Sequence, residues 1–418
     1  MYSLSGKTLF TLTSLYGSVG LWFVCLALCG CITKYEPTGI DEVSDILVVE
    51  GIITDDETTI TLSRSINLTG EYWGSSSSYN QYAVSDVSNA KVYVECEDGT
   101  LWQAAPPIPN TSYDYYIGMG SQFTIKTGTL NPDNKYRLKI EIEEVDYGSD
   151  DCYPNLLGEI TCPTKTYEYC SAYSHPIKTP EIDSIFWIKK GRGQPVLIHV
   201  ATHSPDHQVM YYCWSYKEDW EINANFMMDG YPYYCWNKSS SSDLLIGSAE
   251  RTVFGQLTDK ITEISPSNNR LSVLYRINVK QNAISKRAYD YFENIKKNSQ
   301  QIGSLFAPTP SELRGNITCT TYPDRAVIGY VDISATTQMT TYIPHRNDLY
   351  EPPRWQCDLT PLDSLILWYP PREGAEWELP DFYIEYDTLA KKYILIQCVD
   401  CTLNQGTTQK PDNWPNNH

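Results

Sequence analysis

Apolar and polar residues alternate with a period of two along most of the chain, which predicts a protein built mainly of β-strands. Lys91–Cys96 alternates in this way, Glu97-Asp98-Gly99 can form a turn, and Thr100–Gln103 can return as the second strand of a hairpin. The segment from about 285 to 298 instead spaces its apolar residues as a helix does, and Ser285 is a candidate cap. The other strong strand predictions are 46–53, 58–63, 137–142, 182–188, 195–201, 271–280, 325–333, 382–386 and 393–398.

The strands fall into two groups, so we predict two antiparallel β-sandwiches of the immunoglobulin or fibronectin type III kind. The second sandwich would carry the helix. In the first, the spacing Leu130-x-Pro132-x-x-x-Tyr136 resembles a tyrosine corner. In that motif a buried phenol hydroxyl bonds to the backbone a few residues upstream.

Aromatic residues gather on one face of the strand that begins near Tyr212. Tyr212, Trp214, Tyr216, Glu218 and Trp220 would share this face because side chains two residues apart point the same way. Aromatic residues on one face of a strand usually bury against a second sheet, so core packing is the favoured interpretation. We keep one alternative, in which three tryptophans contact a partner or ligand: Trp214, Trp220 and Trp236.

The apolar segment Leu21–Cys31 follows a single basic residue, Lys7, and ends in Leu28-Cys29-Gly30-Cys31. A short apolar run that closes on small residues is typical of an export signal. Its last four residues resemble a bacterial lipobox, in which cleavage leaves a cysteine that carries lipid. Cys31 is therefore the predicted site of lipid attachment. The alternatives are an uncleaved membrane anchor and a soluble secreted protein.

These patterns together divide the chain into six parts. We expect a lipoprotein signal peptide at 1–30, a tether at 31–45, an immunoglobulin-like sandwich at 46–165, a linker at 166–180, a larger β-rich domain with one helix at 181–403, and a loosely held polar tail at 404–418.

Charge and cysteine content narrow the choice of partner and compartment. The formal net charge of −19 argues against nucleic acid, which is bound by clustered lysine and arginine. Ten cysteines follow Cys31, and an even number in an exported protein suggests disulfides. Cys213 and Cys235 flank the Tyr- and Gly-rich stretch 223–234, so we expect them to bridge. We expect Cys357 to pair with Cys398 or Cys401.

Motifs that carry chemistry are missing from the sequence. It contains no His-Glu-x-x-His, no Gly-x-Ser-x-Gly and no phosphate-binding loop. His199, His203 and His207 have a helical spacing, but they fall in a strand-like run broken by Pro205. Two carboxylates facing one cleft would suit a glycosidase, and Glu218 and Glu221 cannot be assigned to such a cleft. We therefore predict no catalytic residue, metal or cofactor.

Six segments, taken in order, resemble a family of Gram-negative outer-membrane lipoproteins of unknown function (domain of unknown function 4249). They are Leu47–Gly51, Tyr212–Glu221, Ala288–Phe292, Pro310–Ile317, Ile328–Tyr330 and Cys398–Thr402. The genes of such families typically lie beside those of TonB-dependent (SusC-like) transporters. The resemblance implies a lipid-anchored outer-membrane protein, not an enzyme, that assists ligand capture or uptake by such a transporter. It would face the cell surface, with the periplasmic face as the alternative. A β-sandwich hydrolase acting on glycans or peptides and a surface adhesin or structural lipoprotein remain alternatives.

The lipobox-like ending generates a first prediction. Replacing Cys31→Ser should release the protein from the membrane or leave the precursor unprocessed, because serine has no thiol to receive the lipid. Intact-mass analysis of the native protein measures the lipid increment directly. A mature mass without that increment would contradict the anchor.

Overall fold

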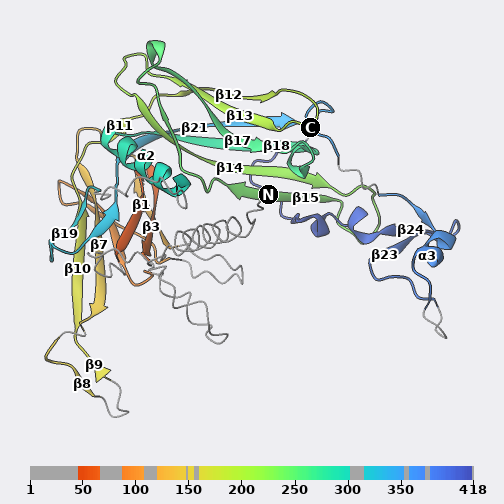
Figure 1. Ribbon diagram of the computed structural model, residues 1–418, viewed down its shortest axis with the longest axis horizontal. Helices are drawn as coiled ribbons and strands as arrows, with labels where there is room; N and C mark the ends of the chain where they lie inside the picture. Colours follow the sequence, from red (N-terminus) through yellow and green to blue (C-terminus); the bar gives the residue numbers. More distant parts are fainter. Residues whose placement is uncertain are drawn as a thin grey trace, which may run out of the picture. The chain divides into compact units, whose positions relative to one another are not determined.

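The computed structural model describes residues 46–65, 87–107, 120–146, 149–154, 160–301, 315–352, 357–371 and 377–416 (Figure 1). The predicted signal peptide, tether and lipid-bearing Cys31 lie outside these ranges. Within them, the helices are too short or too polar to cross a bilayer. The described part is mainly β, as the alternating pattern predicts.

Two sheets form the first sandwich. One has four strands in the order β20-β1-β3-β6, and the other has five in the order β19-β10-β7-β4-β5. The strands are β1 (Leu47–Gly51), β3 (Asp56–Arg64), β4 (Lys91–Cys96), β5 (Leu101–Gln103), β6 (Ser121–Gly128), β7 (Tyr136–Val145), β10 (Thr164–Ser171), β19 (Ile317–Cys319) and β20 (Val327–Gly329). A small hairpin, β8 (Tyr153–Pro154) and β9 (Ile160–Thr161), extends the connection between β7 and β10.

The inward faces of these strands make one apolar core. Alternate residues of β7, Leu138, Ile140 and Ile142, are fully buried in it. The predicted tyrosine corner is confirmed, because the backbone N–H of Asn131 donates to the hydroxyl of Tyr136 at 2.8 Å. Burial raises the pKa of Tyr136, which keeps the hydroxyl protonated.

The first sandwich is completed by a distant part of the chain, which the predicted domain boundaries do not include. β19 pairs with β10, and β20 pairs in parallel with β1. The expected linker, 166–180, also differs, since β10 continues the sheet to Ser171. Strands as short as β19 and β20 form only where a longer strand offers free backbone N–H and C=O groups for pairing. Their own sequence therefore does not reveal which strand they pair with.

The second sandwich packs a large sheet against a small one (Figure 1). The large sheet has seven strands: β11-β21-β18-β14-β15 with β16 beside β14 and β2 beside β21. The small sheet is β12-β13-β17. The strands are β2 (Ile53–Thr54), β11 (Ile177–Lys178), β12 (Ile182–Lys189), β13 (Val196–His203), β14 (Tyr211–Asn223), β15 (Tyr234–Ser240), β16 (Leu245–Ser248), β17 (Gln256–Ile264), β18 (Leu274–Ala283) and β21 (Ile333–Pro344). Short 3-10 turns, η2 (Val253–Gly255) and η3 (Asn269–Leu271), precede β17 and β18.

The aromatic face of β14 lies in this core, as favoured by the sequence. Tyr212 and Trp214 are buried, and the indole N–H of Trp214 donates to the Gln281 side chain at 2.8 Å. With both sandwiches present, the predicted mainly-β fold with a helix in the second half is confirmed.

Helix α2 (Lys286–Gln301) follows β18, and its Ala288 packs with Ile52 and Tyr330, where the chain passes between the two sandwiches. The predicted cap is confirmed, since the Ser285 hydroxyl accepts from the N–H of Ala288 at 3.2 Å. Asp332 accepts the N–H of Ser285 at 2.6 Å and precedes β21, which pairs with β2. The hydrogen bond to Asp332 thus fixes the start of the helix beside the start of β21.

The C-terminal part adds a third, small sheet in the order β22-β24-β23. Its elements are β22 (Thr360–Pro361), α3 (Leu362–Trp368), β23 (Tyr383–Asp387), β24 (Lys392–Leu395), η4 (Ile396–Cys398) and η5 (Cys401–Asn404). The alternating pattern predicts β23 and β24 but not α3, which is only seven residues long.

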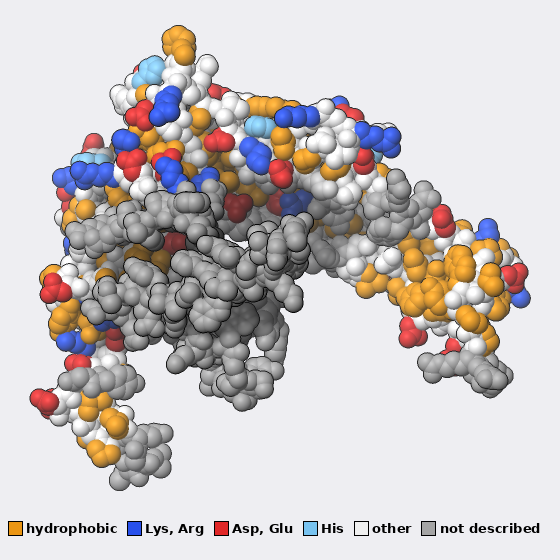
Figure 2. Space-filling model, in the orientation of Figure 1, with side chains coloured by type: hydrophobic (Ala, Val, Ile, Leu, Met, Phe, Trp, Pro, Cys, Tyr) orange, Lys and Arg blue, Asp and Glu red, His pale blue; other side chains and the backbone are white. Residues whose placement is uncertain are grey.

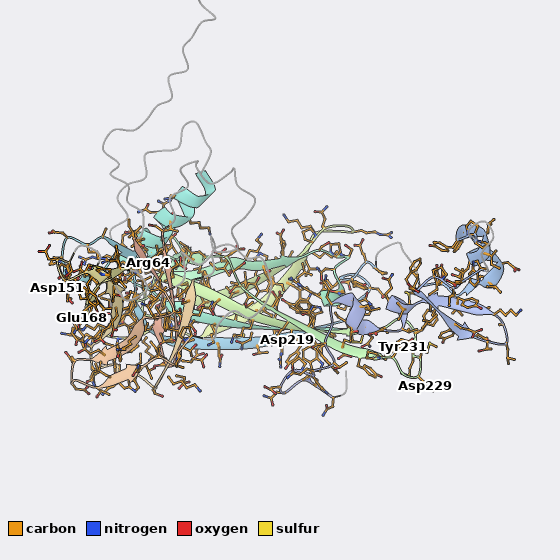
Figure 3. All side chains as sticks on the ribbon, turned by 90° about the horizontal axis from the view of Figure 1, so that it is seen from below. Arg64, Asp151, Glu168, Asp219, Asp229 and Tyr231 are labelled. Carbon is orange, nitrogen blue, oxygen red and sulfur yellow. A yellow bond between two sulfur atoms is a disulfide. The ribbon has the colours of Figure 1, made fainter. Side chains whose placement is uncertain are left out.

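Glu168 on β10 connects three strands of the first sandwich and generates a pH-dependent prediction (Figure 3). Its carboxylate lies 3.0 Å from the Lys139 ammonium on β7 and accepts from the Thr320 hydroxyl, just after β19, at 2.8 Å. The hydrogen bond from Lys139, followed by that from Thr320, lowers the pKa of Glu168 below 4.5. A lowered carboxyl pKa stabilises the fold above the unfolded pKa, and this contribution is lost as pH falls through the folded pKa.

Replacing Glu168→Gln should therefore lower the free energy of unfolding by about 1 kcal/mol at pH 7 and change it little near pH 3. Urea unfolding at the two pH values measures the difference. Glu143→Gln is the matched control, because its contact with Lys91 at 3.4 Å is mostly exposed. An equal loss of stability at both pH values would contradict the ionic contribution.

Candidate docking surface

The third sheet and its helix form a C-terminal module, here defined as the described residues of 357–404. It lies on the loop that joins β14 to β15, the residues 224–233. Phe226, Met228 and Tyr231 of that loop pack against the buried Ile394, Cys398 and Val399 of the module. Figure 3 shows Tyr231 and Asp229 beside the C-terminal ribbon.

Two disulfides attach the module to the second sandwich and close it on itself. Cys235 on β15 is bonded to Cys401, and Cys357 is bonded to Cys398. The expected pairing of Cys357 with Cys398 or Cys401 is confirmed. A third bridge, Cys152–Cys162, closes the β8–β9 hairpin.

The expected bridge between Cys213 and Cys235 is wrong. Cys235 pairs across the ladder with Ile222, nine positions along β14 from Cys213. Nine residues of strand span roughly 30 Å, whereas a disulfide needs Cα atoms within about 7 Å. Cys213 is a free thiol, and burial raises its pKa to about 12. The flanking positions predicted a loop closure, but β14 continues well past Cys213 before the chain turns.

Backbone hydrogen bonds extend this attachment into the predicted polar tail. Trp236 and Thr407 exchange backbone bonds at 2.7 and 2.8 Å. Trp414 is only 5% exposed, and its indole N–H donates to Glu221 at 3.0 Å. Residues 404–416 are therefore held against the second sandwich, in contrast to the loosely held tail that the composition predicts.

Helix α3 presents apolar side chains outward. Asp363 lies in its first turn, where a negative charge favours the start of a helix. Leu365 is completely buried, whereas Leu367 is 78% exposed and Trp368 is 58% exposed. So short a helix has room for one buried contact, and the residues that follow Leu365 point to solvent.

Six large side chains of the module make up what we call the apolar surface: Ile366, Leu367, Trp368, Tyr369, Phe382 and Leu389. Leu389, in the turn between β23 and β24, is fully exposed. That turn lies beside the start of α3, because the N–H of Leu362 donates to the carbonyl of Lys391. Figure 2 shows hydrophobic side chains gathered on this module. Exposed apolar side chains gathered in this way are typical of binding sites.

The aromatic members of the apolar surface are held in place by one another. The ring centroids of Tyr369 and Phe382 are 5.5 Å apart in an edge-to-face arrangement. Phe382 also contacts the buried Tyr383, with centroids 5.5 Å apart. The indole N–H of Trp377 donates to the carbonyl of Tyr369 at 2.9 Å. Rings fixed in this way lose little conformational freedom when they bind.

The three tryptophans named as candidates for partner contact lie elsewhere. Trp214 and Trp220 are buried in the second sandwich, so contact with a partner there is ruled out by burial. Trp236 is half-buried beside Thr407. The exposed tryptophan that the sequence analysis did not single out is Trp368. Its available signal was the apolar run Leu365–Tyr369, which begins four residues after Pro361.

Glu218 and Glu221 are both buried, and each has a defined structural partner. Glu218 is 1% exposed, lies 3.0 Å from the Arg270 guanidinium and accepts from the Tyr275 hydroxyl at 2.6 Å. Glu221 accepts from Trp414. Burial, followed by the charge of Glu218, raises the pKa of Tyr275. Both carboxylates are therefore engaged inside the protein.

The three histidines named in the sequence analysis do not form a cluster. His199 stacks on Phe186, and the Nδ1 of His203 lies 2.7 Å from an Asp183 oxygen. Across the ranges that the structure describes, no three His, Cys, Asp or Glu side chains are grouped as metal ligands would be.

A surface hollow beside α2 is lined by Ile177, Gln208–Tyr211 and Ile284–Lys286. Two of its polar side chains have structural partners, since Ser285 caps the helix and Lys286 pairs with Asp290 at 3.0 Å. The apolar surface of the module is therefore the stronger candidate for function.

A family model described as a domain of unknown function, DUF4249, matches residues 32–155 and 159–340, more than half of the chain. The chain belongs to the DUF4249 family. Five of the six segments that carry the resemblance fall within the matched residues. The sixth, Cys398–Thr402, and the rest of the C-terminal module lie beyond them.

A solved structure titled "Cytokine receptor complex - Crystal form 1A" is similar to this DUF4249 chain at 10% identity. The alignment covers 56% of this chain and 84% of that one, with a TM-score of 0.16. No curated protein matches the sequence.

The attachment of the module generates a prediction for the double variant Cys235→Ser/Cys401→Ser. The bridge spans 166 residues, so its loss should lower the free energy of unfolding by about 5 kcal/mol in the chain-entropy account. The module should also become sensitive to protease before the sandwiches do. Urea unfolding measures the first effect, and limited proteolysis with mass mapping measures the second. Cys152→Ser/Cys162→Ser, which opens a bridge spanning only 10 residues, is the control. Equal protease resistance of the module in both variants would contradict this role.

Proposed function

We propose that this DUF4249 protein is a lipid-anchored, non-enzymatic partner of a TonB-dependent outer-membrane transporter and that it docks through the apolar surface of its C-terminal module. The observation that carries the proposal is the exposure of Leu367, Trp368 and Leu389 on a small, disulfide-held module. The anchor would keep the protein at the membrane where the transporter lies. Docking would then hold it at the transporter during ligand capture or uptake.

The composition of the apolar surface supports a protein partner. Burying a leucine side chain contributes about 2 kcal/mol, and a central tryptophan is often worth about 2 kcal/mol or more at an interface. Leu367 and Trp368 are adjacent and both mostly exposed, so one contact can bury both. The aromatic cluster around Tyr369 is already ordered, which lowers the entropic cost of binding.

Two other lines of support come from the sequence. The ending Leu28–Cys31 resembles a lipobox. The residue after the cysteine is Ile32 and not an aspartate, which is typical of an outer-membrane anchor. The resemblance to DUF4249 lipoproteins implies a transporter partner. Display over the extracellular mouth of the barrel is the arrangement we favour. Protease treatment of intact cells tests it, because full protection would place the protein on the periplasmic face.

The described contacts favour this function over a hydrolase. A glycosidase of the usual kind needs two carboxylates on either side of a substrate. Glu218 and Glu221, which the sequence offered for that role, are bonded to Arg270, Tyr275 and Trp414 inside the protein. Because these two carboxylates already bind residues inside the protein, we favour docking through the exposed apolar surface over hydrolysis.

The variant Leu367→Ser/Trp368→Ser should reduce recovery of the transporter by at least about tenfold, because it removes two interface anchors. The measurement is co-purification from detergent-solubilised outer membranes, with the transporter quantified by mass spectrometry. Val253→Ser/Phe254→Ser is the matched control, since these adjacent apolar residues of η2 are 70% and 71% exposed on the second sandwich.

Equal recovery of the transporter with both variants would show that it does not bind through the apolar surface. If no transporter copurifies with the wild-type protein and deletion of its gene leaves uptake unchanged, the transport proposal itself is wrong. The hydrolase or adhesin alternatives would then take its place.

A further inference from the structure

Exposed carboxylates border the apolar surface. Over residues 357–404 the sequence holds nine acidic and three basic residues. The exposed acidic side chains of the described part are Asp358, Asp363, Glu378, Asp381, Glu385 and Asp387. None of these six forms an ion pair with another residue that the structure describes.

Their positions place several of these carboxylates next to the apolar side chains. Asp363 precedes Ile366 and Leu367 by three and four residues in α3, a spacing that puts side chains side by side on a helix. Asp381 adjoins Phe382 in the chain, and Glu378 adjoins Trp377, which is bonded to Tyr369. Figure 2 shows both acidic and basic side chains at the margins of the hydrophobic area, and the described basic ones are Lys391 and Lys392.

A border of this kind restricts what can cover the surface. A partner that buries the apolar centre must bring its own edge close to the carboxylates. An acidic or apolar edge would repel them or remove their water without compensation, whereas lysine and arginine would pair with them. The same charge disfavours an anionic lipid surface.

We infer that the partner is a protein surface with an apolar centre bordered by lysine and arginine side chains, and this inference rests on the proposed function. The apolar centre would supply most of the affinity. The acidic border would select the partner and speed the encounter, as charges at the rim of an interface do. Association should therefore weaken as salt concentration rises.

The triple variant Asp363→Asn/Glu378→Gln/Asp381→Asn tests the border with the apolar side chains intact. Its association rate with the purified transporter should fall several-fold at low salt, its dissociation rate should change little, and its salt dependence should flatten. The matched control is Asp133→Asn/Asp206→Asn/Asp243→Asn, three exposed carboxylates on the sandwiches. Unchanged association of the triple variant would overturn the inference and leave the proposed function standing.

A peptide of defined sequence distinguishes failure of this inference from failure of the proposed function. An amphipathic peptide with a Leu/Trp face bordered by lysine should bind the wild-type protein at least tenfold more tightly than its twin with glutamate in place of lysine. The preference should disappear in the triple variant and persist in the control. If the transporter does not bind, the proposed function fails, and the peptide pair still decides the inference. Equal binding of the twins, or equally tight binding to phosphatidylglycerol vesicles, would overturn it.

Discussion

The covalent bond between Cys235 and Cys401 determines whether the C-terminal segment can present an apolar surface at all. The module buries few large side chains of its own, chiefly Leu365, Ile394 and Val399. A core of that size is marginal without disulfides. Because the two bridges and the loop 224–233 hold the module, its stability does not require Leu367 and Trp368 to be buried. These side chains can therefore remain exposed and available to a partner.

The position of the module depends on where strand β14 ends. β14 is thirteen residues long and pairs with β18 on one edge and with β16 and β15 on the other. Its first part lies in the large sheet, and its last residues lead into the loop that packs against Ile394 and Cys398. Cys235 lies at the start of β15, opposite Ile222. The length of this hairpin thus sets where the module is attached.

The two sandwiches also depend on each other through exchanged strands. The chain leaves the second sandwich after α2, adds β19 and β20 to the first, and returns as β21. Two parallel pairings, β1 with β20 and β2 with β21, accompany this return. Asp332 lies at the transition and caps the Ser285 end of α2. Burial raises the pKa of its carboxyl, and the hydrogen bonds with Ser285 act in the opposite direction.

The sequence by itself determined the local features of this protein. Alternation identified the longer strands, the Leu130–Tyr136 spacing identified the tyrosine corner, and Ser285 marked the start of the helix. Those features depend on side chains close in the chain, so their patterns can be seen without a fold. Tertiary structure decided the return of β19 and β20 and the pairing of Cys235 with Cys401 in place of Cys213. It also decided which tryptophans are buried and that Trp368 is exposed. Each of these outcomes depends on which distant strand or loop covers a residue, and alternation along one strand carries no information about its neighbours across the sheet.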